Sequence, residues 1–157
     1  MPPIRPATAA DVPQIIELEQ QCGTAAHWRP DQYQAIFAAD QLHRIALVAG
    51  ELGASPLQGF LIAASVAGDW EIENLVVHEN CRRKGVGASL VHAFLLQLPV
   101  ARPASVLLEV RESNSPARRL YEKIGFIVDG RRHAYYRSPP EDAVLYRLSL
   151  QICDKTP

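Results

Sequence analysis

Three cations run directly into two glycines in the segment Arg82 to Ala88, whose sequence is RRKGVGA. Glycine lets the backbone approach a ligand closely, and the free N–H groups and dipole at a helix start attract anions. The segment therefore predicts a phosphate-binding loop. The alternative is a solvated loop before an ordinary helix, because short motifs of this kind often match by chance.

The spacing of the glycines excludes two well-known nucleotide motifs. A Rossmann fingerprint needs a third glycine or alanine at position 90, which is Leu90, and a Walker A loop needs Gly-Lys followed by Ser or Thr. A dinucleotide or nucleoside triphosphate is therefore disfavoured as the ligand of this loop.

A second segment, Leu108 to Phe126, contains groups suited to acid and base chemistry. Glu109 lies in an apolar run, and desolvation at the end of a buried strand raises the pKa of a carboxyl group toward the range of a useful base. Tyr121 carries a phenol that can protonate a thiolate, although its pKa is higher than that of a thiol and the difference costs about 2 kcal/mol. Two plainer interpretations stay open: Glu109 pairs with Arg111 or Arg131, and Tyr121 is a core aromatic.

Apolar periodicity predicts the elements that position these segments. Strands are expected at 4–7, 45–49, 59–67, 70–77, 106–110, 126–136 and 143–150, and helices at 9–21, 30–39, 86–98 and 117–124. This order predicts an α/β (α+β) mixed fold, with a central twisted mixed sheet of about seven strands and four helices on both faces.

The strand from Trp70 to Val77 has an irregular pattern. Trp70 and Ile72 share one parity while Leu75 and Val77 share the other, so the alternation changes near Glu73-Asn74. A β-bulge explains the change, and full burial of the end of the strand explains it equally well.

Length and composition favour one soluble globular domain, residues 1–150, with a tail at 151–157. The chain has 157 residues, 48% of them hydrophobic, and a net charge of -1, which argues against a nucleic-acid binder. The charge is uneven, however. Residues 78–147 hold 12 lysines and arginines against 7 acidic residues, and this basic half suits a small polyanionic ligand.

The cysteines indicate neither disulfides nor a metal site. Cys22, Cys81 and Cys153 are odd in number and far apart, with no paired ligand spacing, as expected in the reducing cytoplasm. The first residues contain no apolar signal segment, and no run is long enough to span a membrane. We expect a cytoplasmic protein that binds no membrane and no metal.

The two segments together resemble the GNAT family of N-acetyltransferases. Arg82 to Gly87 follows its Arg/Gln-x-x-Gly-x-Gly/Ala motif, and Asn114 to Phe126 follows Asn-x-x-Ala-x-x-Leu-Tyr-x-x-x-Gly-Phe. Further similarity is to the bacterial branch that acetylates ribosomal-protein alanine, through Leu-Glu-Val-Arg before Asn114, Tyr135-Tyr136, Glu141-Asp142-Ala143 and Trp28. The resemblance extends over nearly the whole chain.

The resemblance implies acetyl-CoA as cosubstrate and direct acetyl transfer to an amine, with N–H groups of the bulged strand holding the oxyanion. The implied cofactor-binding residues are Leu75, Val76 and Val77 for the acyl and pantetheine arm, Arg83, Lys84, Gly85, Val86, Gly87 and Ala88 for the pyrophosphate, and Asn114 for the pantetheine. Glu109 is implied as general base and Tyr121 as general acid, with Glu73 as a competing base. The chain departs from the family at His78-Glu79, where Asp-Pro is frequent, and at Cys81, where Tyr is frequent.

The implied acceptor is the N-terminal α-amine of a protein, such as a ribosomal protein. An α-amine loses its proton about 2.5 pKa units more easily than lysine, which suits a modest base. Acceptor choice is expected to depend on the loops at His27-Trp28 and at Tyr135 to Asp142. A small-molecule amine or a lysine is the alternative acceptor, and an acetyl-CoA-binding regulatory module is the alternative that is not an enzyme.

Overall fold

The order of helices and strands along the chain is the predicted one. The computed structural model describes residues 1–38, 43–53, 56–99 and 104–150. The strands are β1 (Ile4–Pro6), β2 (Arg44–Ala49), β3 (Gly59–Val66), β4 (Asp69–Val77), β5 (Ser105–Arg111), β6 (Ile127–Arg137) and β7 (Pro140–Ser149). The α-helices are α1 (Val12–Gln20), α2 (Pro30–Ala35), α3 (Val86–Leu95) and α4 (Ser115–Ile124), with 3-10 turns at Ala9–Asp11 and Glu79–Cys81.

The seven strands form one sheet in the order β1-β2-β3-β4-β5-β7-β6. The pairs β1–β2, β2–β3, β5–β7 and β6–β7 are antiparallel. Strands β4 and β5 pair in parallel, with Trp70 opposite Val106 and Glu71 opposite Leu107. The prediction of a mixed sheet of about seven strands is confirmed.

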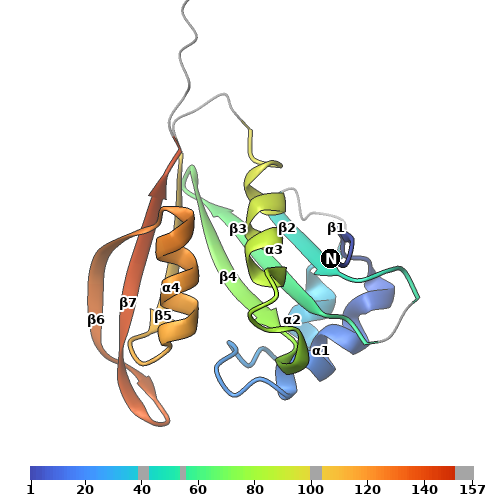
Figure 1. Cartoon of the computed structure of the whole chain (residues 1–157), viewed down its shortest axis with the longest axis horizontal. Coiled ribbons are helices and arrows are strands. Elements are labelled where there is room, and N and C mark those ends of the chain that lie inside the picture. Colours follow the sequence, from blue (N-terminus) through green and yellow to red (C-terminus); the bar gives the residue numbers. More distant parts are fainter. Residues whose placement is uncertain (39–42, 54–55, 100–103, 151–157) are drawn as a thin grey trace, which may run out of the picture. The chain divides into compact units, whose positions relative to one another are not determined.

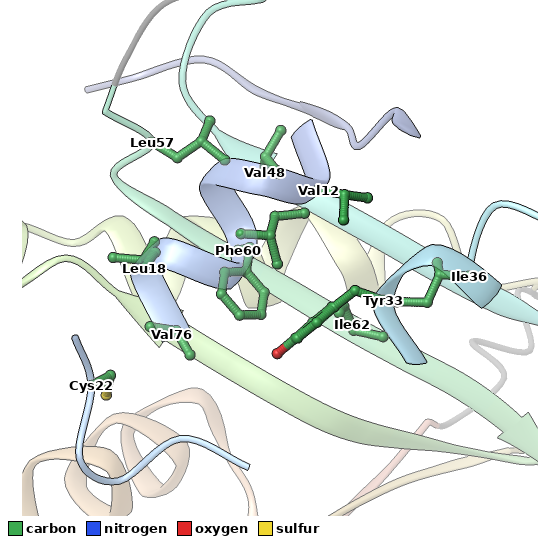
Figure 2. Close-up of a cluster of buried hydrophobic side chains, with 11 residues drawn as sticks. Val12, Leu18, Cys22, Tyr33, Ile36, Val48, Leu57, Phe60, Ile62 and Val76 are labelled. Atoms are coloured by element: carbon green, nitrogen blue, oxygen red, sulfur yellow. The ribbon is translucent and has the colours of Figure 1, made fainter. Parts of the chain in front are cut away.

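The chain folds into two compact units, and the first comprises Met1–Ser65 and Ile72–Gln97. Helices α1 and α2 cover one face of its strands, and their apolar side chains meet Phe60 and Ile62 of β3 there (Figure 2). Helix α3 lies on the other face, because its Val86 and Leu90 approach Gly59 of the same strand (Figure 1). Both faces of these strands are therefore buried.

A network of polar side chains is buried within this first core. Glu19 of α1 is 2% exposed, and its Oε1 accepts hydrogen bonds from the Trp28 backbone N–H (2.9 Å) and from Asn74 Nδ2 (3.1 Å). The Asn74 amide also donates to the Tyr33 hydroxyl at 2.9 Å. The network ties the loop after α1 to strand β4.

The second unit comprises Val66–Glu71 and the described residues from Leu98 on. Its core lies between α4 and strands β5 and β7, where the Tyr121 ring packs edge-on against Phe126 and at a tilt against Tyr146, with ring centroids 5.7 and 6.1 Å apart. Gly125 ends α4 with a φ of 114°, as predicted for a residue that permits a left-handed helix end. The single-domain boundary at residue 150 stays a prediction, and the tail at 151–157 lies outside the described residues.

Several element ends differ from the prediction. Helix α1 begins at Val12 instead of position 9, because residues 9–11 form a 3-10 turn in which Asp11 accepts the Thr8 N–H at 2.8 Å. Helix α3 ends at Leu95 instead of Leu98, since the residue before Pro99 avoids helical geometry. Helix α2 ends at Ala35, and its predicted end at position 39 lies outside the described residues. Strand β7 begins three residues before its predicted start.

Asp11 supports a prediction about acid stability. The Arg5 guanidinium, 2.7 Å from the Asp11 carboxylate, is the main reason that the pKa of Asp11 falls to about 2. A lowered pKa stabilises the fold above the unfolded pKa, near 4, and this contribution disappears as the pH falls toward 2. Asp11→Asn is expected to lower the free energy of unfolding by about 2 kcal/mol at pH 7 and by clearly less at pH 3, as measured by urea titration.

Asp31 provides the control, because its ion pair with Arg29 lies at the surface. Asp31→Asn should change stability by less than about 0.5 kcal/mol at either pH. An equal loss for Asp11→Asn at both values of pH would contradict the linkage.

Candidate active site

The cationic loop lies at the start of α3, as the sequence predicts. Strand β4 ends at Val77, a 3-10 turn follows, and the backbone adopts left-handed φ values of 59° at Arg83 and 84° at Gly85. Alternation of left- and right-handed residues turns successive N–H groups toward one concave side, which suits an anion. The backbone of this loop is therefore suited to an anionic group.

The three cations of this loop differ in what they contact. The Arg82 guanidinium donates to the Val77 carbonyl at 3.1 Å and approaches Cys22 Sγ at 3.7 Å, so it fastens the loop to the protein. The side chains of Arg83 and Lys84 are exposed, and their charge is available to phosphates. Val86 and Gly87 are buried and can contribute only backbone groups.

Two neighbouring side chains of β4, Glu73 and Asn74, both have partners on the side of α1 and α2. Glu73 Oε1 lies 3.3 Å from Arg44 and lines a cavity with α2, while the neighbouring Asn74 bonds to Glu19 and Tyr33 of α1 and α2. Adjacent side chains of a regular strand point to opposite faces, but these two point to the same one. This supports the β-bulge rather than simple burial.

Glu109 lies on β5 among charged and aromatic side chains of β6. Its Oε1 is 2.7 Å from Arg132 Nε, and its side chain is 21% exposed. The Glu109 charge is the main cause that raises the pKa of Tyr135, whose phenol also hydrogen-bonds to the carboxylate. The arginine that pairs with Glu109 is Arg132. The expected ion pair with an arginine is therefore present, but Arg111 and Arg131 were the wrong residues.

Those two arginines have other partners. Arg111 stacks on Tyr136, with its Cζ 4.1 Å from the ring centre, and pairs with Glu141 at 3.4 Å. Arg131 pairs with Glu112. Arg132 lies opposite Ala143 of β7, on the same face as Glu109, because a register shift between Val128 and Gly130 displaces β6 by one residue. A second register shift lies between Arg132 and Tyr136. Ala134 in the shifted segment has a φ of 48°.

Glu71 brings a second carboxylate close to Glu109. It pairs with Leu107, two residues before Glu109, on the adjacent parallel strand, so both carboxylates lie on one face of the sheet. Burial is the main cause that raises the pKa of Glu71, and the charge of Glu109 adds to it. Arg132 lowers that pKa and so counteracts both effects.

Tyr121 is part of the aromatic core of the second unit, and its residue is 6% exposed. Burial raises the pKa of its phenol, and nearby Tyr136 raises it further. The hydroxyl therefore keeps its proton through the physiological range, as a proton donor must. The raised pKa also widens the mismatch with a thiolate beyond the expectation from the sequence.

Asn114 precedes the first turn of α4 and caps it, since its side-chain oxygen accepts the Ala117 N–H at 3.3 Å. Its amide N–H groups are left as donors, which fits the predicted contact with pantetheine. Leu75, Val76 and Val77 and the loop from Arg83 to Ala88 belong to the first unit. Glu109, Tyr121 and Asn114 belong to the second.

Sequence reasoning missed Arg132, the closeness of Glu71 to Glu109, and the role of the Tyr135 phenol. The doublets Arg131-Arg132 and Tyr135-Tyr136 were visible signals, but two register shifts in β6, one between Val128 and Gly130 and one between Arg132 and Tyr136, decide which members face Glu109. Glu71 could have been found from the sequence, because it lies two residues before Glu73 on the same strand.

Residues 12–126 match the acetyltransferase (GNAT) family. The chain belongs to this family. The [ribosomal protein bS18]-alanine N-acetyltransferase of Escherichia coli K12 is 31% identical over 98 residues, which cover 61% of this chain and 66%, just under two thirds, of that protein. The N-alpha-acetyltransferase RimI of Mycobacterium tuberculosis is 28% identical over 145 residues, or 89% of this chain and 87% of that protein.

Solved structures give the same result for the fold. The crystal structure of the ribosomal-protein-S18-alanine N-acetyltransferase from Escherichia coli aligns with a TM-score of 0.80 and 25% identity, covering 100% of this chain and 99% of that one. Arabidopsis thaliana NAA60 in complex with acetyl-CoA aligns with a TM-score of 0.78 at 20% identity, covering 96% and 99%. The GNAT fold is confirmed.

GNAT acetyltransferases use acetyl-CoA, so acetyl-CoA is the cosubstrate of this chain. Within the described ranges, no group of three or more histidines, cysteines, aspartates or glutamates is placed to hold a metal ion. In the same part of the chain, no helix is long and apolar enough to cross a membrane.

The left-handed Gly85 leads to a prediction about cofactor affinity. A side chain at a φ of 84° costs about 1 to 2 kcal/mol and turns the loop N–H groups away, whereas its Cβ would meet only the flexible end of Met1. Gly85→Ala is expected to weaken acetyl-CoA binding about 5- to 30-fold by calorimetry. Gly53→Ala, at a φ of 76° in a distant turn with open space around it, imposes similar strain and should leave the affinity unchanged.

Proposed function

We propose that this acetyltransferase modifies the N-terminal α-amine of a protein, with a ribosomal protein as the leading acceptor class. The placement of Glu109 beside Arg132, Tyr135 and Glu71 is the observation that carries this proposal. A net negative cluster attracts the ammonium form of the amine, and a carboxylate then accepts its proton. The names of the bacterial relatives support the same acceptor.

The proposed reaction is a direct transfer. The neutral amine attacks the thioester carbonyl, the C–N bond forms and the C–S bond breaks. Glu109 accepts the ammonium proton before the attack, and the Tyr121 hydroxyl protonates the departing thiolate. The nitrogen loses its second proton as the intermediate collapses to the amide, and this proton restores the Tyr121 phenol. Backbone N–H groups at the β4 bulge stabilise the oxyanion. No step requires a covalent enzyme intermediate.

In the same proposal, two sets of residues bind acetyl-CoA. The backbone of Leu75, Val76 and Val77 and the side chain of Asn114 contact the acyl and pantetheine arm. The pyrophosphate lies on Arg83, Lys84, Gly85, Val86, Gly87 and Ala88, where left-handed backbone and exposed cations favour an anion.

Mass spectrometry of a panel of acceptors with acetyl-CoA tests the function. The panel contains peptides with free α-amines that start with Ala or Ser, matched peptides with a blocked α-amine and one lysine, and polyamines. We expect an added acetyl group on the free α-amines. Acetylation restricted to lysines or polyamines would overturn the proposed acceptor.

A further inference from the structure

A cavity of about 370 Å³ in the first unit has no role in the chemistry described above. It is lined by Trp28, Gln32, Ala35, Arg44 and Glu73, which come from the loop after α1, from α2 and from strands β2 and β4. Its polar lining and aromatic wall are typical of a place that binds part of a small ligand.

The Arg44 guanidinium is held in a fixed orientation in this cavity. Its Cζ lies 5.5 Å from the centre of the Trp28 ring, and its Nη2 donates to Glu73 Oε1 at 3.3 Å. Among the described residues, no further hydrogen bond is made by this guanidinium, so Nε and Nη1 can still donate. A planar guanidinium with two free donors matches the geometry of a carboxylate.

Glu73 does not present its charge to the cavity in the same way. Oε1 accepts the hydrogen bond from Arg44, and Oε2 has no exposed surface. The side chains of Arg44 and Glu73 are 29% and 22% exposed, and the hydrogen-bond donors that meet an entering ligand are those of the Arg44 guanidinium. This favours an anionic ligand over a cationic one.

The aromatic wall is fixed before any ligand binds. The Trp28 backbone N–H donates to the buried Glu19, which also accepts from Asn74 of β4. The centre of the buried Tyr33 ring lies 5.3 Å from the centre of the Trp28 ring. A wall ordered in advance reduces the entropy that binding must overcome.

We propose that this cavity binds a carboxylate of the acceptor, with Arg44 donating the hydrogen bonds and the Trp28 indole contacting the adjacent carbon atoms. The inference rests on the proposed function, because it places the acceptor near Leu75, two residues after Glu73 on β4. The carboxylate belongs to an acidic side chain among the first residues of a peptide or to the α-carboxylate of a free amino acid.

A steady-state comparison of acceptors tests the proposal. The acceptors are peptides of equal length with Asp, Asn or Lys at the second or third position, free amino acids, and amines without a carboxylate. For the acceptors that carry a carboxylate, Arg44→Gln is expected to raise KM about 10- to 100-fold, because the variant loses a hydrogen bond to a charged group. The matched control is Arg29→Gln, an exposed arginine next to the same loop, which should change nothing.

The possible outcomes distinguish a failure of the carboxylate site from a failure of the proposed function. If Arg44→Gln leaves the preference among acetylated peptides unchanged, the carboxylate site is wrong and the function stands. If only free amino acids are acetylated, and Arg44→Gln abolishes this activity, the carboxylate in the cavity is the α-carboxylate of a free amino acid. This result would overturn the proposal that the acceptor is a peptide. If nothing is acetylated, the Trp28 fluorescence of Trp70→Phe protein, titrated with Asp-containing peptide, still tests the cavity, and no response to the peptide overturns the inference.

Folding of the variant is checked by thermal melting. If Arg44→Gln is unfolded, Arg44→Lys retains the charge without the planar pair of donors, and we expect it to show a similar loss for carboxylate acceptors. A folded lysine variant with the wild-type preference would contradict the proposed geometry.

Discussion

Glu109→Gln is expected to lower kcat for peptide acetylation about 10²- to 10⁴-fold, the usual contribution of a general base. Glutamine has the same shape and can still accept a hydrogen bond from Tyr135, but it cannot take the ammonium proton. The measurement is the initial rate at saturating acetyl-CoA. The affinity for acetyl-CoA, measured by calorimetry, should stay within about 2-fold, because the proposed cofactor contacts lie on other residues.

The neighbouring carboxylates on β4 are the controls. Glu73→Gln and Glu71→Gln keep shape and remove one charge each, so their losses show whether proton transfer belongs to one residue. A larger loss in Glu73→Gln than in Glu109→Gln would move the base to β4. Full activity of Glu109→Gln would refute the assignment, since a carboxylate that only pairs with Arg132 is dispensable for chemistry.

Arg132 allows a second control on the same prediction. Removal of the Glu109 charge leaves this arginine without its partner, and a misplaced cation could repel the acceptor ammonium. Glu109→Gln combined with Arg132→Gln removes that repulsion. We expect the double variant to stay as slow as the single one, because the missing base, and not the stray cation, limits the rate.

The long elements and the loop motif could be predicted from the sequence because each depends on local residue order. The apolar stripe of α3 and the glycine at the end of α4 produce helices wherever their periodicity and caps occur. The turn before α3 likewise depends on Gly85, whose φ of 84° needs no tertiary partner. The β-bulge indicated by the change of parity at Glu73-Asn74 is supported by the contacts of these two side chains and stays a prediction.

Pairings between distant residues could not be predicted in the same way. Which of three arginines meets Glu109 depends on the shift in β6 between Val128 and Gly130, and one residue of slip turns every side chain to the other face. Glu19 shows the same limit. Its sequence context is an ordinary helix with polar neighbours, and only the approach of Asn74 and the Trp28 loop makes its burial favourable.

Glu19→Ala is expected to lower the free energy of unfolding by about 2 to 5 kcal/mol, because it leaves the buried donors of Trp28 and Asn74 without their acceptor. For a domain of this length the melting temperature should fall by about 5 to 15 °C. Glu17→Ala is the matched control, since Glu17 is exposed on the same helix two residues earlier. It should shift the melting temperature by no more than about 2 °C.

The same substitution connects stability to acceptor binding. Glu19 holds the backbone of Trp28, and the indole of Trp28 is the aromatic wall of the cavity beside Arg44. In protein that is still folded at 20 °C, Glu19→Ala should therefore raise KM for the acceptor while the affinity for acetyl-CoA is kept. Equal weakening of both substrates would mean that the variant only loosens β4, through Asn74, and that the Trp28 loop has no separate part in acceptor binding.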